Sequence, residues 1–210
     1  MLIGQVVASS GVIACECIGN SKKSDDDPYS LRFWFNNYIE TSELQNKFDQ
    51  LSLSQPDIII PTEKRLTNLS ITVSNRNKAF IDVVCVHTIN QQMIRIELQY
   101  SFQTKQCTYV HSNEANITIY CDKLRLNTAG SLLIASYKEA KLNYLSIGLW
   151  SEKLDLLKVL NPFESTREEE KLEASMFRSL VGVEFAGEDE QYVLACYTSG
   201  IVMVRYTALF

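Results

Sequence analysis

The sequence lacks the features that mark membrane, secreted and nucleic-acid-binding chains. No apolar run approaches the ~18 residues of a membrane helix, so we expect no membrane span. The N-terminus has no basic segment followed by an apolar stretch, so we expect no secretory signal. Basic residues form no cluster, and the net charge is −5 at pH 7. This balance disfavours the basic face that nucleic-acid binding requires, so we expect no direct contact with nucleic acid.

Histidine is scarce, which limits metal and catalytic sites. His87 and His111 are the only two histidines, and no Cys-x-x-Cys pair accompanies them as a zinc site requires. P-loop, Rossmann, His-Glu-x-x-His and Gly-x-Ser-x-Gly patterns are absent. We therefore predict a protein that is not an enzyme, with no catalytic residue, metal or cofactor. A Cys/His-dependent enzyme stays open as an alternative, because such pairs meet in space rather than in sequence.

The six cysteines favour a reducing compartment. They are Cys15, Cys17, Cys85, Cys107, Cys121 and Cys196. In a chain of 210 residues without a secretory signal, they are expected to be small buried hydrophobic residues rather than disulfide partners. We therefore predict a cytoplasmic or nuclear protein.

A four-residue pattern typical of a β-strand, which we call the recurring phrase, occurs four times and is the most informative feature of the sequence. Its copies are Ile13–Glu16, Val83–Val86, Ile134–Tyr137 and Leu194–Tyr197. Each copy follows a polar or Gly-containing turn and precedes a second β-rich run, which is typical of a repeated β-meander. The phrase divides a single β-repeat domain, residues 1–210, into units of about 1–60, 61–120, 121–163 and 176–210. The fourth unit has three predicted strands, whereas the third has four.

These strand–turn–strand–turn–strand units resemble divergent blades of WD40-like β-propellers. Trp34 and Trp150 fall near the place where that family often has Trp-Asp, but Phe35 and Ser151 follow them, and no Gly-His dipeptide occurs. The family's His–Ser–Asp–Trp tetrad is therefore not carried over. The resemblance implies a mainly β fold of about four irregular antiparallel meander units. Our leading prediction for the function is a non-enzymatic scaffold that binds other protein subunits in a multi-subunit complex.

Three arrangements remain open. WD40-like blades have ~40–45 residues, and propellers typically close with 4–8 blades. The chain is therefore a piece of a larger propeller, a propeller that a partner completes, or a β-sandwich. An unclosed propeller leaves sheet edges and a half-exposed core, which is unfavourable in water.

Two segments interrupt the β pattern with helical signals. Ser42 and Gln45 form a capping box for a helix over about 42–52, and a second box precedes a helix over about 166–178. The second helix places Leu172 and Met176 one turn apart. Insertions into a repeat scaffold often form its binding face, so Leu172 and Met176 are candidate partner-binding residues.

The strand over 31–35 supplies the other two candidates. Alternation places Leu31, Phe33 and Phe35 on one face and Arg32 and Trp34 on the other. Arg and Trp dominate interface hot spots, so Arg32 and Trp34 are predicted to bind a partner. Packing against the rest of the chain is the alternative interpretation of Trp34.

A phosphoinositide-binding propeller is a further alternative. Propellers of that kind use a Phe-Arg-Arg-Gly motif whose arginines bind headgroup phosphates. This chain has only Phe177-Arg178-Ser179 in its place, so the second arginine is missing.

Overall fold

The computed structural model describes residues 2–18, 29–35, 55–89, 92–116, 123–137, 146–161, 179–198 and 200–206. Over these residues the protein consists of four antiparallel sheets, and no helix is present in them. The described residues thus include no helix long and apolar enough to cross a membrane. The predicted helices at 42–52 and 166–178 lie outside them.

Each sheet is a meander in which consecutive strands pair. The first contains β1 (Leu2–Ser9), β2 (Val12–Ile18), β3 (Tyr29–Phe35) and β4 (Ile58–Thr62). The second contains β5 (Asn68–Arg76), β6 (Phe80–Ile89), β7 (Gln92–Ser101) and β8 (Gln106–Asn116). The third contains β9 (Leu124–Leu126), β10 (Leu132–Tyr137), β11 (Ser146–Ser151) and β12 (Leu156–Leu160). The fourth contains β13 (Leu180–Ala186), β14 (Tyr192–Tyr197) and β15 (Gly200–Arg205).

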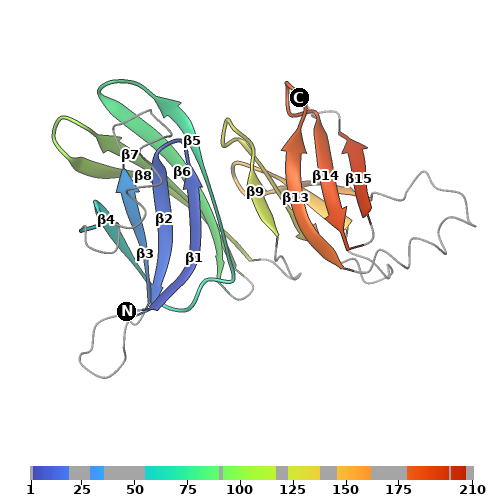
Figure 1. Ribbon diagram of the computed structural model, residues 1–210, viewed down its shortest axis with the longest axis horizontal. Coiled ribbons are helices and arrows are strands. Elements are labelled where there is room, and N and C mark those ends of the chain that lie inside the picture. Colours follow the sequence, from blue (N-terminus) through green and yellow to red (C-terminus); the bar gives the residue numbers. More distant parts are fainter. Residues whose placement is uncertain are drawn as a thin grey trace, which may run out of the picture.

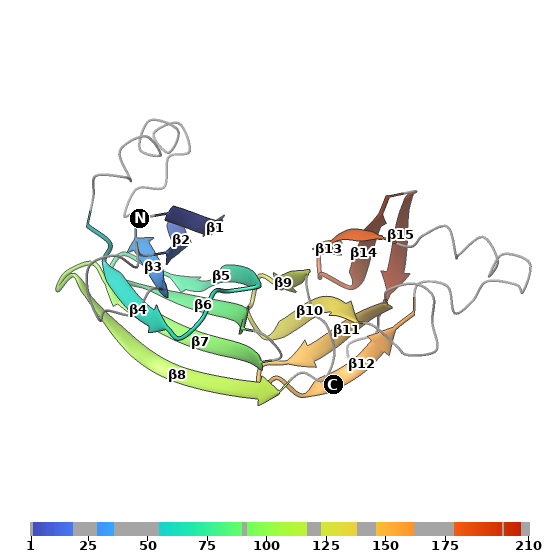
Figure 2. The same ribbon diagram turned by 90° about the horizontal axis from the view of Figure 1, so that it is seen from below.

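The four sheets are arranged as propeller blades. The first strands of successive sheets contact one another, β1 with β5, β5 with β9 and β9 with β13. Figure 1 shows the first sheet at one end of the molecule and the fourth at the other. In Figure 2 the sheets follow one another along an arc, so they do not form the two stacked layers of a sandwich. The predicted mainly β fold of four meander units is confirmed, and it has the propeller arrangement.

Three buried clusters join neighbouring sheets. Phe33 of the first sheet packs with Ile96 of the second, and Val86 of the second packs with Leu133 of the third. Ile147 of the third sheet packs with residues of the fourth, among them Val193. Among the described residues, no cluster joins the first sheet to the fourth. The apolar core therefore lies in three layers between consecutive blades.

The recurring phrase forms the second strand of every sheet. In β2, β6 and β10 it is an almost uninterrupted buried run, because neighbours cover both faces of the strand. In β14 buried positions alternate with partly exposed ones. The fourth sheet is thus covered fully on one face only. The first and fourth sheets both lie at an end of the stack, but Trp34 packs over the outer side of β2, whereas the outer side of β14 stays partly exposed.

Candidate functional site

The fourth sheet presents an apolar face to solvent. Val193 and Ala195 of β14 point into the core, whereas Leu194 and Cys196 point to the opposite side. Leu194 pairs with Met203, and Cys196 pairs with Ile201. Ile201 is 69% exposed and Met203 is 61% exposed, although both are large apolar side chains. We call this surface, defined by Leu194, Cys196, Ile201 and Met203, the outer face of the fourth sheet.

The first sheet has a comparable face at the other end of the arc. Cys15 pairs with Val6 and with Arg32, and Arg32 pairs with Ile59, so these four residues share one side of the sheet. Val6 and Ile59 are about half exposed, at 48% and 50%. Together with Trp34, these residues define the outer face of the first sheet.

The structure brings two of the four predicted binding residues together. Arg32 and Trp34 both lie on the outer face of the first sheet, where the Arg32 Nε donates to the Ser30 Oγ at 3.1 Å. Trp34 packs over a buried cluster that includes Ile13 and Cys17. The indole thus covers its own sheet while remaining partly exposed. Leu172 and Met176 lie outside the described residues.

The opposite side of the same strand forms core, as its alternation predicts. Leu31 and Phe33 are fully buried against the second sheet. Phe35 stacks on Tyr100 of β7 with ring centroids 4.3 Å apart. The Tyr100 hydroxyl donates to the Asp57 carboxylate at 3.0 Å, and burial together with this hydrogen bond raises the Tyr100 pKa to about 12.

Sequence reasoning missed the outer face of the fourth sheet. The sequence predicts a third strand in the fourth unit. The alternation of Ile201 and Met203 with Val202 and Val204 does not show which side of that strand other residues cover. Val202 and Val204 pack on the third sheet, which leaves the other pair exposed. The number of strands could have indicated this exposed face from the sequence. Among the described residues the other sheets have four strands, whereas this sheet has three.

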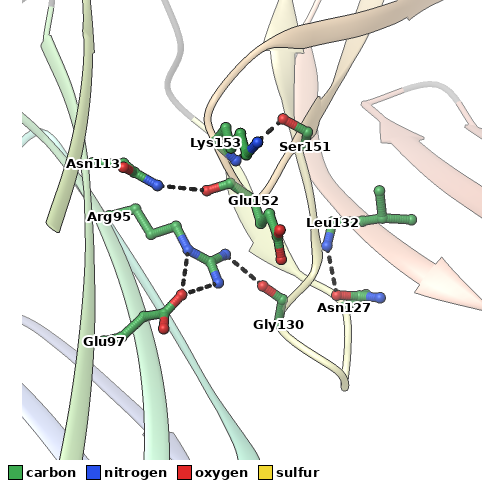
Figure 3. Close-up of polar contacts among 9 residues, drawn as sticks. All are labelled: Arg95, Glu97, Asn113, Asn127, Gly130, Leu132, Ser151, Glu152 and Lys153. Carbon is green, nitrogen blue, oxygen red and sulfur yellow. Dashed lines mark hydrogen bonds and ion pairs between the residues drawn. The ribbon is translucent and has the colours of Figure 1, made fainter. Parts of the chain in front are cut away.

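Polar contacts fix successive sheets to one another. The buried Arg95 of β7 donates twice to the Glu97 carboxylate, at 3.1 and 2.6 Å, and donates a third time to the Gly130 carbonyl. Gly130 belongs to the turn between β9 and β10, so this guanidinium joins the second sheet to the third (Figure 3). Asn113 makes a second link by donating to the Glu152 carbonyl at 3.2 Å. Directed contacts of this kind hold the blades in a defined relative orientation.

Two cavities lie between the sheets. One of about 310 Å³ is lined by the first strands of all four sheets, with Val7, Leu69, Leu124 and Val183 among its residues. It occupies the place of the central channel of a propeller. The other, of about 500 Å³, lies between β4 of the first sheet and the second sheet.

Burial keeps three of the described cysteines in their thiol form at neutral pH. Burial raises the pKa of Cys15 to about 11, and the neighbouring Cys17 adds to this shift. Burial also raises the pKa of Cys107 to about 11 and strongly raises that of Cys85. These thiols are protonated at pH 7, whereas the thiolate is the nucleophile. Within the described residues, no three His, Cys, Asp or Glu side chains form a group that could hold a metal ion.

The described sheets therefore have the arrangement of propeller blades. No protein-family profile and no curated protein matches the chain. Sqt1 from Chaetomium thermophilum is similar over 97% of this chain and 45% of its own length, with a TM-score of 0.46 and 15% identity. An oligogalacturonate lyase in complex with manganese is similar over 99% and 49%, with a TM-score of 0.38 and 12% identity.

The β-propeller domain of Nup133 from Vanderwaltozyma polyspora is also similar. The alignment covers 98% of this chain and 54% of that domain, with a TM-score of 0.31 and 10% identity. The chain thus spans about half the length of the solved structures that it matches.

Proposed function

We propose that the protein is a non-enzymatic interaction scaffold, a propeller-like portion of a multi-subunit complex. A protein partner binds at the outer faces of the first and fourth sheets and completes the β-structure. The observation that carries this proposal is the exposure of large apolar side chains on both end faces, while the same residue types are buried in all three internal layers. Contiguous exposed apolar surface marks interaction sites in soluble proteins.

The fourth sheet offers a second mode of contact. β15 is an edge strand of the described sheet, and no residue in it is fully buried. An edge strand presents backbone N–H and C=O groups that a further strand can pair with. A partner strand beside β15 would give this sheet the four strands that the other three have.

Rigid geometry, rather than catalysis, is the proposed mechanism. Arg95 and the three apolar layers fix the sheets, so the end faces are held at a constant separation. The proposal that the protein is not an enzyme is supported by the raised pKa values of its buried thiols. We further propose a reducing compartment, the cytoplasm or the nucleus, because the five described cysteines are unpaired.

Site-specific photo-crosslinking in the native cell tests the proposed surface. A photoreactive phenylalanine replaces Ile201 on the fourth sheet or Ile59 on the first. The control replaces Leu157 of β12, which is also an exposed apolar residue, at 41%, but lies on neither end face. We expect adducts of discrete mass from positions 201 and 59 that position 157 does not give.

A double substitution then measures the contribution of the fourth sheet. Ile201→Glu with Met203→Glu is expected to lower affinity for the crosslinked partner at least about tenfold, because the interface would have to bury two unpaired carboxylates. Leu156→Glu with Leu157→Glu is expected to leave affinity unchanged. Identical adducts from all three positions, or equal affinity of both double variants, would contradict the proposal.

A further inference from the structure

The cavity of about 500 Å³ between the first and second sheets has the size of a small-molecule site. Ile60 and Thr62 of β4 line one side, and His87 of β6 with Ile94 and Ile96 of β7 line the other. It lies within the layer between two blades and is separate from both outer faces.

Two buried polar atoms of its lining residues lack hydrogen-bond partners. Among the described residues, the Thr62 Oγ1 and the His87 Nδ1 are buried and unpaired. Thr62 is 6% exposed and His87 is 2% exposed. The third atom of this kind in the described part of the chain, the Ser146 Oγ, belongs to another sheet. Buried polar atoms are nearly always paired, so two unpaired atoms in residues around one cavity point to a ligand that pairs with them.

The remaining lining restricts the chemistry of that ligand. Four isoleucines line the cavity beside polar side chains, so the lining suits a ligand that has both an apolar part and a polar group. The rim carries the carboxylates of Glu63 and Glu114 and the ammonium group of Lys64. Glu114 accepts a hydrogen bond from the Gln92 Nε2 at 2.8 Å, which holds its carboxylate at the rim. An anionic ligand would meet two carboxylates there and is therefore disfavoured.

We propose that this cavity binds an uncharged apolar group that carries a hydroxyl, namely a phenol. A hydroxyl both donates and accepts, so it can pair with an imidazole nitrogen or with a threonine hydroxyl. Phenols occur as the side chain of tyrosine in a peptide and as free small molecules. Burial lowers the pKa of His87 to about 4, so its imidazole is neutral at pH 7 and suits an uncharged ligand.

Titration of the whole chain with matched ligands tests the proposal. The protein is labelled with ¹⁵N-histidine, and His111→Gln assigns the signals of its two histidines. p-Cresol and toluene differ by one hydroxyl, as do N-acetyl-tyrosinamide and N-acetyl-phenylalaninamide. We expect p-cresol to shift the His87 imidazole nitrogens and to bind about tenfold more tightly than toluene, the ratio that one buried hydrogen bond gives. Binding of N-acetyl-tyrosinamide as well identifies a peptide tyrosine, whereas binding of p-cresol alone identifies a free phenol.

Two substitutions at Thr62 separate recognition from folding. Thr62→Val keeps the side-chain volume and removes the hydroxyl, so the preference for p-cresol over toluene should fall towards one. Thr62→Ser keeps the hydroxyl and should retain the preference. Both variants are compared with the unsubstituted chain by urea unfolding. Equal binding of the two ligands, no binding of either, or shifts of the His111 nitrogens alone would overturn the proposal.

Discussion

At the scale of single residues, His87 makes stability depend on pH. Burial lowers its pKa from 6.5 to about 4, so the unfolded chain binds this proton more readily than the folded chain does. The folded state has its full stability from this group above pH 6.5, where the imidazole is neutral in both states. That stability is lost as the pH falls from 6.5 towards 4. We expect His87 to lower the free energy of unfolding by about 3 kcal/mol between pH 6.5 and 4. Urea unfolding at several pH values measures this change.

Substitution of His87 isolates its contribution to the pH dependence of stability. His87→Gln should flatten the pH dependence of the free energy of unfolding between pH 6.5 and 4. Comparing the slopes of the two chains, rather than their absolute stabilities, removes the background from carboxylates that both chains share. A His87→Gln slope equal to that of the unsubstituted chain would contradict the assignment.

Glu16 is a buried carboxylate that organises the start of the chain. It is fully buried in β2, and its Oε1 accepts from the Leu66 N–H at 2.7 Å while its Oε2 accepts from the Gln5 N–H at 3.3 Å. Glu16→Ala leaves both donors unpaired, so we expect urea unfolding to show a loss of about 2–4 kcal/mol. Glu16→Gln keeps an accepting oxygen and should lose less. A larger loss of stability for Glu16→Gln than for Glu16→Ala would show that packing, rather than hydrogen bonding, dominates at this position.

At the scale of elements, the turn between β9 and β10 locks the third sheet onto the second. Gly130 in this turn has a φ of +71°, and an added Cβ would lie 2.7 Å from the Val84 Cγ2. Gly130→Ala is therefore expected to destabilise the protein by about 2–4 kcal/mol in urea unfolding, through backbone strain and overlap. Gly182→Ala is the matched control, because nothing lies within 4 Å of an added Cβ there. Its stability should change by less than about 0.5 kcal/mol.

The strands were predictable from sequence because their periodicity is local. The recurring phrase predicted the second strand of all four sheets and alternation predicted the strand over 31–35, whereas β4 (Ile58–Thr62) crosses the predicted boundary between the first two units. Alternation also placed Arg32 and Trp34 on one face. Which face is covered depends on the order of the sheets, and Glu16 meets the Leu66 N–H from 50 residues away. Neither the exposed face at Ile201 nor the cavity at His87 has a local signal of that kind.

At the scale of the whole molecule, the buried clusters of the described residues join each sheet only to its neighbours in sequence. The second and third sheets have an apolar layer on both faces, whereas the first and fourth have one each among the described residues. Contacts of this nearest-neighbour type make stability a sum of units and interfaces rather than a single cooperative quantity. The two end sheets are therefore not equivalent to the inner ones, although all four share the same meander.

The fourth sheet is expected to open first. It has one interface and three described strands, while the first sheet has four strands and contributes to the largest of the described clusters. Native-state hydrogen exchange should therefore show β14 and β15 exchanging through local opening, with β6 and β7 protected up to the global free energy of unfolding. Binding of a partner to the outer face of the fourth sheet would raise protection there and leave β6 unchanged. Uniform protection of all sheets in the isolated chain would contradict this gradient, since it would require contacts beyond those between neighbouring sheets.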